Sequence, residues 1–70
     1  MKLGERVRFL REGRGLSRYF VATRAQIQVG HYGKIEKGQV RDPKWSTIQA
    51  LCRALDIEAD TLRDDAPPPA

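Results

Sequence analysis

Apolar residues recur at steps of three and four along most of the chain, which is the spacing of the buried face of an α-helix. Leu3, Val7 and Leu10 share one such face and predict a first helix over residues 2–13. No segment alternates apolar and polar residues for long enough to predict a β-strand. The pattern therefore predicts an all-α fold, a compact bundle of five short helices. Their predicted segments are residues 2–13, 16–25, 28–37, 45–55 and 58–63.

Residues that favour caps and turns mark the ends of these helices. Gly13 and Gly15 predict the stop of the first helix, because glycine readily adopts the left-handed backbone found there. Ser17 is a predicted N-cap, since its hydroxyl can accept a hydrogen bond from an amide of the first turn. Gly38 is the predicted residue after the third helix, and Pro43 ends the loop that follows.

The remaining apolar faces define the predicted core. Val21, Ala22 and Ala25 face inward from the second helix, and their small size predicts that another helix crosses closely. Trp45 is predicted to anchor the start of the fourth helix in the core, with a partner surface as the alternative. Cys52 is interpreted as a small core hydrophobe. The other predicted core residues are Tyr32, Ile35, Ile48, Leu51, Leu55, Ile57 and Leu62.

Length and composition limit the classes of protein to consider. The 70 residues predict one small domain over 1–63 and a Pro-rich, extended and disordered tail over 64–70. The single cysteine excludes an internal disulfide, and no Cys/His spacing fits zinc, so we expect neither a metal nor a cofactor. No apolar run approaches the ~18 residues of a membrane span, and the N-terminus lacks a signal-peptide core. A cytoplasmic protein without membrane contact is expected.

Charge is distributed unevenly over a chain whose net charge is +4. Residues 1–44 hold eleven Lys and Arg against four acids, whereas residues 45–70 hold two against five. A basic part of net +7 beside an acidic part of net −3 is typical of a domain that docks on a polyanion through one face. The alternative is a solvated surface that is rich in arginine.

The second and third predicted helices have the spacing of a helix-turn-helix: about eight residues, a break of three or four, and about nine residues. The segments that carry a wider likeness are LGERVRFLREGRGLS, VATRA, GKIEKG, Pro43 and TIQALCRALDIEADTL. Together they resemble the phage-repressor-like helix-turn-helix family, the XRE or Cro/repressor type. The resemblance covers residues 3–62 without gaps.

The resemblance implies a λ-repressor-like bundle whose third helix, residues 28–37, enters the major groove of double-stranded DNA. In that groove Gln28 would pair with adenine, Lys34 with guanine, and Val29 with a thymine methyl group. The implied base contacts are Gln28, Val29, Gly30, His31, Gly33 and Lys34. The implied phosphate contacts are Ser17, Arg18, Tyr19, Lys37, Arg41 and Lys44, the last two having solvated loop charge as the alternative.

The chain departs from the family pattern at several of these positions. Arg18 stands where the family commonly has glutamine, and its charge and reach suit a phosphate. Tyr19 and Phe20 replace the usual acidic pair; the Tyr19 hydroxyl can reach a phosphate, whereas Phe20 has no evident role on DNA. Gln26 replaces the turn glycine, which is unfavourable if the position needs a positive φ. Gln28 replaces a serine and is a poorer N-cap.

Gly30 and Gly33 lie within a predicted helix, where each costs about 1 kcal/mol relative to alanine. Three interpretations stay open. The glycines let the helix lie deep in the groove, they leave the segment loose until it binds, or they are tolerated without effect. Together with the weak cap, they predict that 28–37 is the least protected helix of the free protein.

Several charged residues are given structural or general roles. Glu36 is predicted to pair with Arg11, since the acidic residue of this motif is usually structural in the family. Arg6, Arg8 and Arg14 are predicted to spread the basic field without fixed contacts.

Phe9, Phe20 and His31 complete the set of candidates. The two phenylalanines fall off the core faces and are predicted either to form a further interface or to fold over the edges of the core. His31 has no Cys, Asp or Glu at metal-ligand spacing, so a backbone or base-edge contact is preferred to a metal.

The leading functional prediction is a sequence-specific DNA-binding transcription regulator, a repressor that covers promoter DNA on the nucleoid. Such domains usually bind as homodimers on half-sites about 34 Å apart. The alternative is a protein-interaction module, such as an antitoxin or adaptor, that uses Phe9, Phe20 and the tail. An enzyme is not predicted, because no nucleophile–His–acid set, phosphate loop or paired carboxylates are present. RNA is disfavoured because no stacking platform on a sheet is expected.

Overall fold

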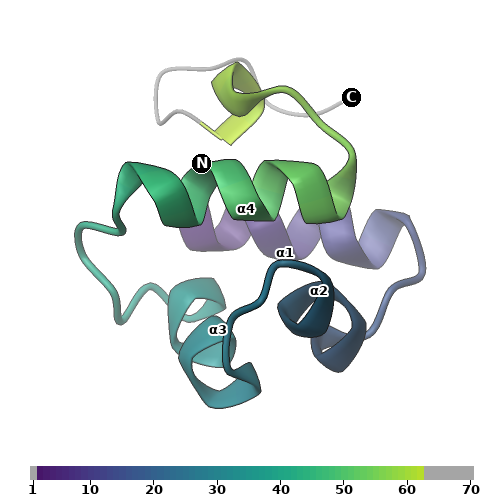
Figure 1. Cartoon of the computed structure of the whole chain (residues 1–70), viewed down its shortest axis with the longest axis horizontal. Coiled ribbons are helices and arrows are strands. Elements are labelled where there is room, and N and C mark those ends of the chain that lie inside the picture. Colours follow the sequence, from purple (N-terminus) through teal and green to yellow (C-terminus); the bar gives the residue numbers. More distant parts are fainter. Residues whose placement is uncertain (1, 63–70) are drawn as a thin grey trace.

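The computed structural model describes residues 2–62, and all of its regular structure in that range is helical. Four α-helices follow one another, and a short 3-10 turn completes the chain that the structure describes (Figure 1). The elements are α1 Leu3–Gly13, α2 Arg18–Arg24, α3 Val29–Glu36, α4 Trp45–Leu55 and η1 Ala59–Leu62.

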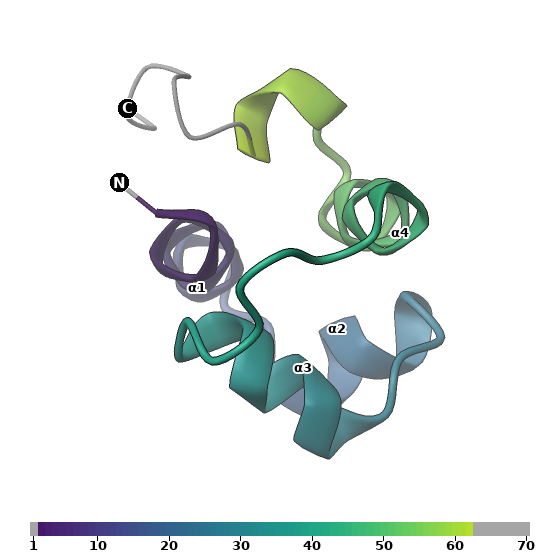
Figure 2. The same cartoon turned by 90° about the vertical axis from the view of Figure 1, so that its left-hand side faces the viewer.

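The helices form two layers. α1 and α4 lie side by side and are seen end-on in Figure 2, with η1 packed over both of them. α2 and α3 lie on the opposite side of this pair, where α2 packs against α3 and α4, and α3 packs against α1. The helix-turn-helix pair therefore forms one end of the molecule, away from η1.

Glycines and caps end the helices where the sequence predicted. Gly15 and Gly38 have positive φ angles of 67° and 76°, the left-handed conformation that follows α1 and α3. The hydroxyl oxygen of Ser17 accepts a hydrogen bond from the Phe20 amide at 3.0 Å and caps α2. Gln28 provides no side-chain cap for α3, which confirms the prediction of a weak start.

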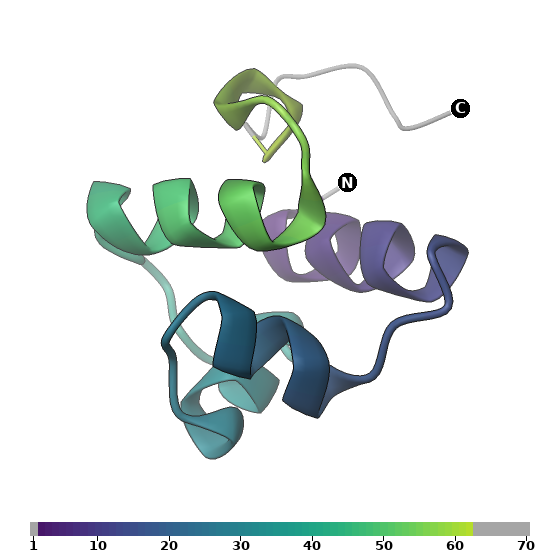
Figure 3. The same cartoon turned by 45° about the vertical axis from the view of Figure 1, so that its right-hand side comes forward.

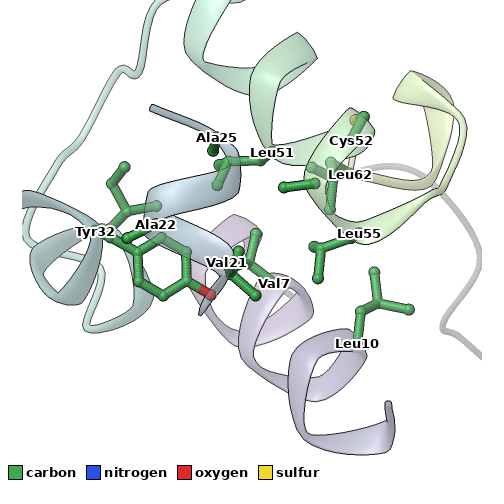
Figure 4. Close-up of a cluster of buried hydrophobic side chains, with 12 residues drawn as sticks. Val7, Leu10, Val21, Ala22, Ala25, Tyr32, Leu51, Cys52, Leu55 and Leu62 are labelled. Carbon is green, nitrogen blue, oxygen red and sulfur yellow. The ribbon is translucent and has the colours of Figure 1, made fainter. Parts of the chain in front are cut away.

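The core joins residues from α1, α2, α3, α4 and η1 (Figure 4). Val7, Val21 and Leu51 are fully buried at its centre, and Leu62 closes it from η1. The small residues Ala22 on α2 and Ala25 directly after it are buried, as predicted, where neighbouring helices pack closely. Cys52 is buried in this cluster, and burial raises the pKa of its thiol.

The prediction of a fifth α-helix is wrong. Its segment forms only a four-residue 3-10 turn, Ala59–Leu62, after a left-handed Asp56 at the end of α4. So few residues cannot offset the cost of starting an α-helix, whereas 3-10 turns of three or four residues are common. The predicted tail, 64–70, lies outside the described residues.

Trp45 is not the predicted core anchor: 54% of it is exposed. Along the same helical stripe Ile48 is partly buried and Leu51 is fully buried, so burial increases toward the C-terminal half of α4. The first turn of α4 extends past the N-terminal end of α1 in the view of Figure 3.

Arg6 also differs from its prediction, because only 1% of this residue is exposed. It lies on the buried side of α1 beside Val7 and so does not belong to a general surface field. Arg8 and Arg14 make local contacts: Arg8 pairs with Glu12 at 3.3 Å, and Arg14 donates to the Leu10 carbonyl at 3.4 Å. Arg8 and Arg14 therefore make fixed contacts, contrary to the prediction.

No helix within residues 2–62 is long and apolar enough to span a membrane.

Candidate nucleic-acid interface

The turn between α2 and α3 fixes the angle of the helix pair. Gln26 adopts a left-handed conformation with φ of 60°, so this chain places glutamine where glycine would be unstrained. The Ile27 backbone amide donates to the Ala22 carbonyl at 2.8 Å, and the Gln26 backbone amide donates to the Thr23 carbonyl at 3.1 Å. These bonds close the end of α2 and direct the chain into α3.

One side of α3 is anchored in the domain and the other is open. Tyr32, Ile35 and Glu36 are buried, and at 100° per residue they place the outward face of the helix opposite, centred on Gly30. Of the six predicted base-contact residues, five are exposed and Gly33 is partly exposed: Gln28, Val29, Gly30, His31, Gly33 and Lys34. All six residues are therefore accessible along α3 and its N-cap, Gln28.

Neither glycine of α3 is required by packing. An added Cβ at Gly30 or Gly33 would meet no atom within 4 Å, and neither residue has a positive φ. The outer face of α3 thus has no side chain at Gly30 and Gly33, and Lys34 lies one turn beyond Gly30 on the same face. This leaves the three interpretations of the glycines open but removes any explanation within the fold itself.

Arg18 connects the start of α2 to the end of α3. Its Nε lies 3.5 Å from Glu36 Oε1, while about half of its side chain stays exposed. The Arg18 side chain therefore reaches the end of α3 at Glu36, the residue that directly precedes Lys37. Ser17 keeps its hydroxyl proton available for donation, since its oxygen is the acceptor in the cap.

The loop after α3 adds further basic residues. Arg41 and Lys44 are exposed, and Arg41 lines a hollow of about 320 Å³ with Lys2, Gly4 and Gly38. A neighbouring hollow of about 280 Å³ brings Lys2 beside Lys37. Lys2 was not among the sequence candidates, because its position at the start of α1 gives no sign that α3 ends beside it.

Arg11 and Glu36 form the predicted pair, and it is buried. Arg11 Nε donates to Glu36 Oε2 at 2.6 Å and Nη2 donates to Oε1 at 3.3 Å, while Nη1 donates to the Leu16 carbonyl at 2.9 Å. Burial opposes the charge of Glu36, but the hydrogen bond from Arg11 and the nearby positive charges outweigh it and lower the pKa of this carboxyl. The hydrogen bond with Glu36 raises the pKa of Arg11.

The same carboxylate affects Tyr32. Burial, and then the adjacent Glu36 carboxylate, raise the pKa of the Tyr32 hydroxyl well above its usual 10. One buried acid therefore links α1, α2 and α3 at the base of the outward helix.

Gly4 is a structural residue that sequence reasoning missed. A Cβ at Gly4 would lie 2.6 Å from the Glu36 carbonyl oxygen and against that of Ile35. The absence of a side chain lets α1 approach the last turn of α3. A glycine early in an otherwise regular helix was the available signal.

The predicted exposure of the two phenylalanines is confirmed: Phe9 is 45% and Phe20 43% exposed. The Phe20 ring is not bare, because the Arg24 guanidinium lies over it at 5.8 Å from the ring centroid. Arg24 was overlooked, although its i+4 spacing from Phe20 would allow this pairing. Tyr19 is the most exposed aromatic residue among those described, at the start of α2.

His31 is exposed on the flank of α3. Within residues 2–62, no group of three His, Cys, Asp or Glu side chains lies close enough to hold a metal ion.

The sequence matches the protein family described as "Helix-turn-helix domain" over residues 2–66. The chain belongs to this family. The match confirms the type of domain predicted from the segments around α2 and α3.

Two proteins are similar to this member of the helix-turn-helix family. The HTH-type transcriptional regulator DdrOP3 of Deinococcus deserti is 39% identical over 62 residues, which are 89% of this chain and 47% of that protein. The chain thus spans about half the length of this curated relative. The restriction-modification controller protein C.AhdI of Aeromonas hydrophila has a crystal structure that matches with a TM-score of 0.82 and 36% identity, over 87% of this chain and 91% of that chain.

Proposed function

We propose that this helix-turn-helix protein is a sequence-specific, double-stranded DNA-binding transcription regulator that inserts α3 into the major groove. The observation that carries the proposal is the outer surface of α3, where residues 28–31 and 34 are exposed while Tyr32 and Ile35 hold the helix in the domain. A helix of this exposure fits a groove about 12 Å wide. Similarity to a transcriptional regulator and to a restriction-modification controller supports a regulatory role.

The residues divide into those that read bases and those that hold phosphates. Gln28 and Lys34 supply hydrogen-bonding groups for base edges, and Val29 supplies an apolar contact. His31 lies at the margin of this set. The phosphate contacts in the proposal are Ser17, Arg18, Tyr19, Lys37, Arg41 and Lys44, which are all exposed.

The regulator acts as a repressor by occupying promoter DNA, and it binds as a homodimer in the cytoplasm. A single α3 contacts only a few base pairs, so two copies on half-sites about 34 Å apart are needed for a specific site. Trp45 on α4 and Phe9 on α1 are exposed apolar residues available to such a dimer, which light scattering over a range of concentrations would detect.

Selection of bound sequences from a random DNA pool, followed by titration at low ionic strength, tests the function. The proposal predicts an enriched motif with higher affinity than a scrambled duplex. Absence of association with any duplex at low salt would refute it, since even non-specific binding by phosphate contacts should then be visible.

A protein-interaction module is the second candidate, favoured by the exposed Phe9 ring. Loss of a partner in Phe9→Ala and Phe20→Ala variants, with DNA affinity intact, would support it. Phe20 is the weaker member of this pair because Arg24 covers its ring.

A further inference from the structure

The Glu36 carboxylate on α3 faces two arginines that come from two other helices. Arg11 on α1 contacts both of its oxygens, at 2.6 Å and 3.3 Å, and only 9% of the Arg11 side chain is exposed. Arg18 on α2 lies 3.5 Å from Oε1 through its Nε, and 54% of its side chain is exposed. Arg11 is therefore the closer, buried partner of the acid. The three groups together keep one net positive charge, and Arg18 carries it to the surface.

The Arg18 guanidinium is suited to contact two acceptors at once. Its N–H donors are fixed in one plane and point along more than one edge of the group. With Nε facing Glu36, the donors of the Nη groups suit a second acceptor at the exposed side. A phosphate fits this position, because an arginine binds it in a defined orientation through paired hydrogen bonds. Ser17 precedes Arg18 and has its hydroxyl proton available for the same anion.

A guanidinium that is held in place binds a phosphate more favourably than a mobile one. An exposed arginine loses rotamer entropy when it is fixed on a ligand, and a side chain that is already oriented loses less. The carboxylate that orients Arg18 belongs to α3, so the contact also connects the start of α2 to the helix proposed for the groove. A glutamine, which is common at this position in the family, could not form the ion pair.

We propose that Glu36 is a positioning residue for DNA binding, because its carboxylate holds the Arg18 guanidinium toward a backbone phosphate at the start of α2. This proposal rests on the proposed function, since it requires a duplex beside α2 and α3. It gives the buried acid a role in binding in addition to its role in stability. A phosphate held by Arg18 fixes the register of α3 on the duplex, because phosphate contacts position a protein for the base contacts that give specificity.

Methylphosphonate substitution tests the proposal, since it removes the charge of one phosphate at a time. In the duplex selected from a random pool, each phosphate is replaced in turn, and affinity is measured by fluorescence anisotropy at constant salt. At the phosphate bound by Arg18 we expect about a tenfold loss in the wild type, the ratio that corresponds to a hydrogen bond with a charged group. In Arg18→Ala the same replacement should have little effect, which identifies that phosphate.

The Glu36→Gln variant then shows whether the acid acts through Arg18. The loss at the identified phosphate should shrink to about threefold or less, because residues in contact are energetically coupled. The loss at a phosphate identified in the same way with Arg41→Ala should stay unchanged. A structural role alone would alter the response at every phosphate alike. Circular dichroism at the titration temperature checks that Glu36→Gln is folded, and if it is not, the following variant decides.

Arg18→Lys tests the same point and leaves the buried pair of Arg11 and Glu36 intact. Its ammonium keeps the charge but lacks the planar fork that meets a carboxylate and a phosphate together. The loss at the identified phosphate should again be about threefold or less. A tenfold loss there in either folded variant, an equal change at every phosphate, or no phosphate that depends on Arg18 would overturn the proposal while specific binding persists. Absence of specific binding to any duplex would overturn the proposed function as well.

Discussion

Glu36 connects three helices through one side chain. It accepts hydrogen bonds from Arg11 on α1, lies near Arg18 on α2 and is buried at the end of α3. A buried carboxylate is stable in this position only while its positive partners remain. The orientation of α3 relative to α1 and α2 therefore depends on the ionised form of Glu36.

The lowered pKa of Glu36 predicts acid sensitivity with a definite sign. The unfolded chain takes up the proton near the usual 4.5, and the folded chain does so only at lower pH. The stabilisation is therefore complete above about pH 4.5 and is lost as pH falls through the lower, folded pKa. Thermal unfolding between pH 7 and 3 should show this loss, and it should be absent in Glu36→Gln, which starts from lower stability.

Glu12 provides the matched control. It pairs with Arg8 at 3.3 Å and with Arg11 at 3.8 Å, but more than half of its own side chain is exposed, so Glu12→Gln should change stability little and keep the acid sensitivity. A melting temperature that does not fall with pH in the wild type would contradict the role given to Glu36.

The close packing around Gly4 predicts a loss of stability when a side chain is added there. A methyl group there would meet the backbone of Glu36, so Gly4→Ala should lower the free energy of unfolding by about 1–3 kcal/mol. Gly13 is the control, because a Cβ there meets nothing within 4 Å and Gly13→Ala should be neutral or slightly stabilising. Urea denaturation followed by circular dichroism measures both. Equal stability of the two variants would argue against close packing of α1 on α3.

At the scale of helices, the sequence predicted well which α-helices form and where they end, because residues close in the sequence decide both. Ser17, Gly15 and Gly38 act on their own helix termini, so the predicted boundaries of α1, α3 and α4 lie within one residue of those observed. Burial was predicted less well because it depends on what lies across from a helix. Trp45 has the correct spacing for the core but is the first residue of α4, whose buried residues lie in its C-terminal half.

In the candidate interface, too, local features were predicted better than contacts between distant segments. Positions on the outer side of α3 could be predicted from the spacing of Tyr32 and Ile35, since one helix has only one opposite face. Contacts between segments that are distant in the sequence were harder to predict. Glu36 and Arg11 were paired through the family resemblance, whereas Lys2 beside the end of α3 had no signal in the sequence.

The composition of α3 predicts a helix that is weak by itself. Gly30→Ala and Gly33→Ala should each raise the free energy of unfolding by about 0.5–1 kcal/mol, because both sites are open and helical. In the wild type, α3 amides should exchange with solvent faster than α1 amides, and the alanine variants should slow them. Hydrogen exchange read by NMR measures this directly.

Gly38 is the control for these alanine variants. Its φ of 76° makes Gly38→Ala strained, so this variant should be less stable than the wild type. If α3 lies deep on DNA, Gly30→Ala should also bind the selected duplex more weakly despite its greater stability. Amide exchange as slow in α3 as in α1 would contradict the predicted weakness of the helix.

At the scale of the whole molecule, charge and fold point to the same surface. The basic excess of residues 1–44 includes the start of α2, the end of α3 and the following loop, whereas residues 45–70 are mildly acidic. A molecule with this division is oriented by the field of a polyanion before it makes specific contacts.

The charge distribution predicts the dependence of binding on salt. If Arg18, Lys37, Arg41 and Lys44 each neutralise one phosphate, the slope of log affinity against log salt should be about −3.6 per domain. Arg41→Ala should reduce the magnitude of this slope by about 1 on cognate and random duplexes alike. Titrations between 50 and 200 mM salt measure it. A slope near zero would exclude these side chains as phosphate contacts.

The most direct test of the account compares Lys34→Ala with the wild type on the selected duplex and on a scrambled duplex of equal length. If the outer side of α3 lies in the major groove with Lys34 on a base edge, the variant should lose about 1–3 kcal/mol on the selected duplex and much less on the scrambled one. An equal loss on both duplexes, or no loss on either, would contradict the placement of α3 in the groove.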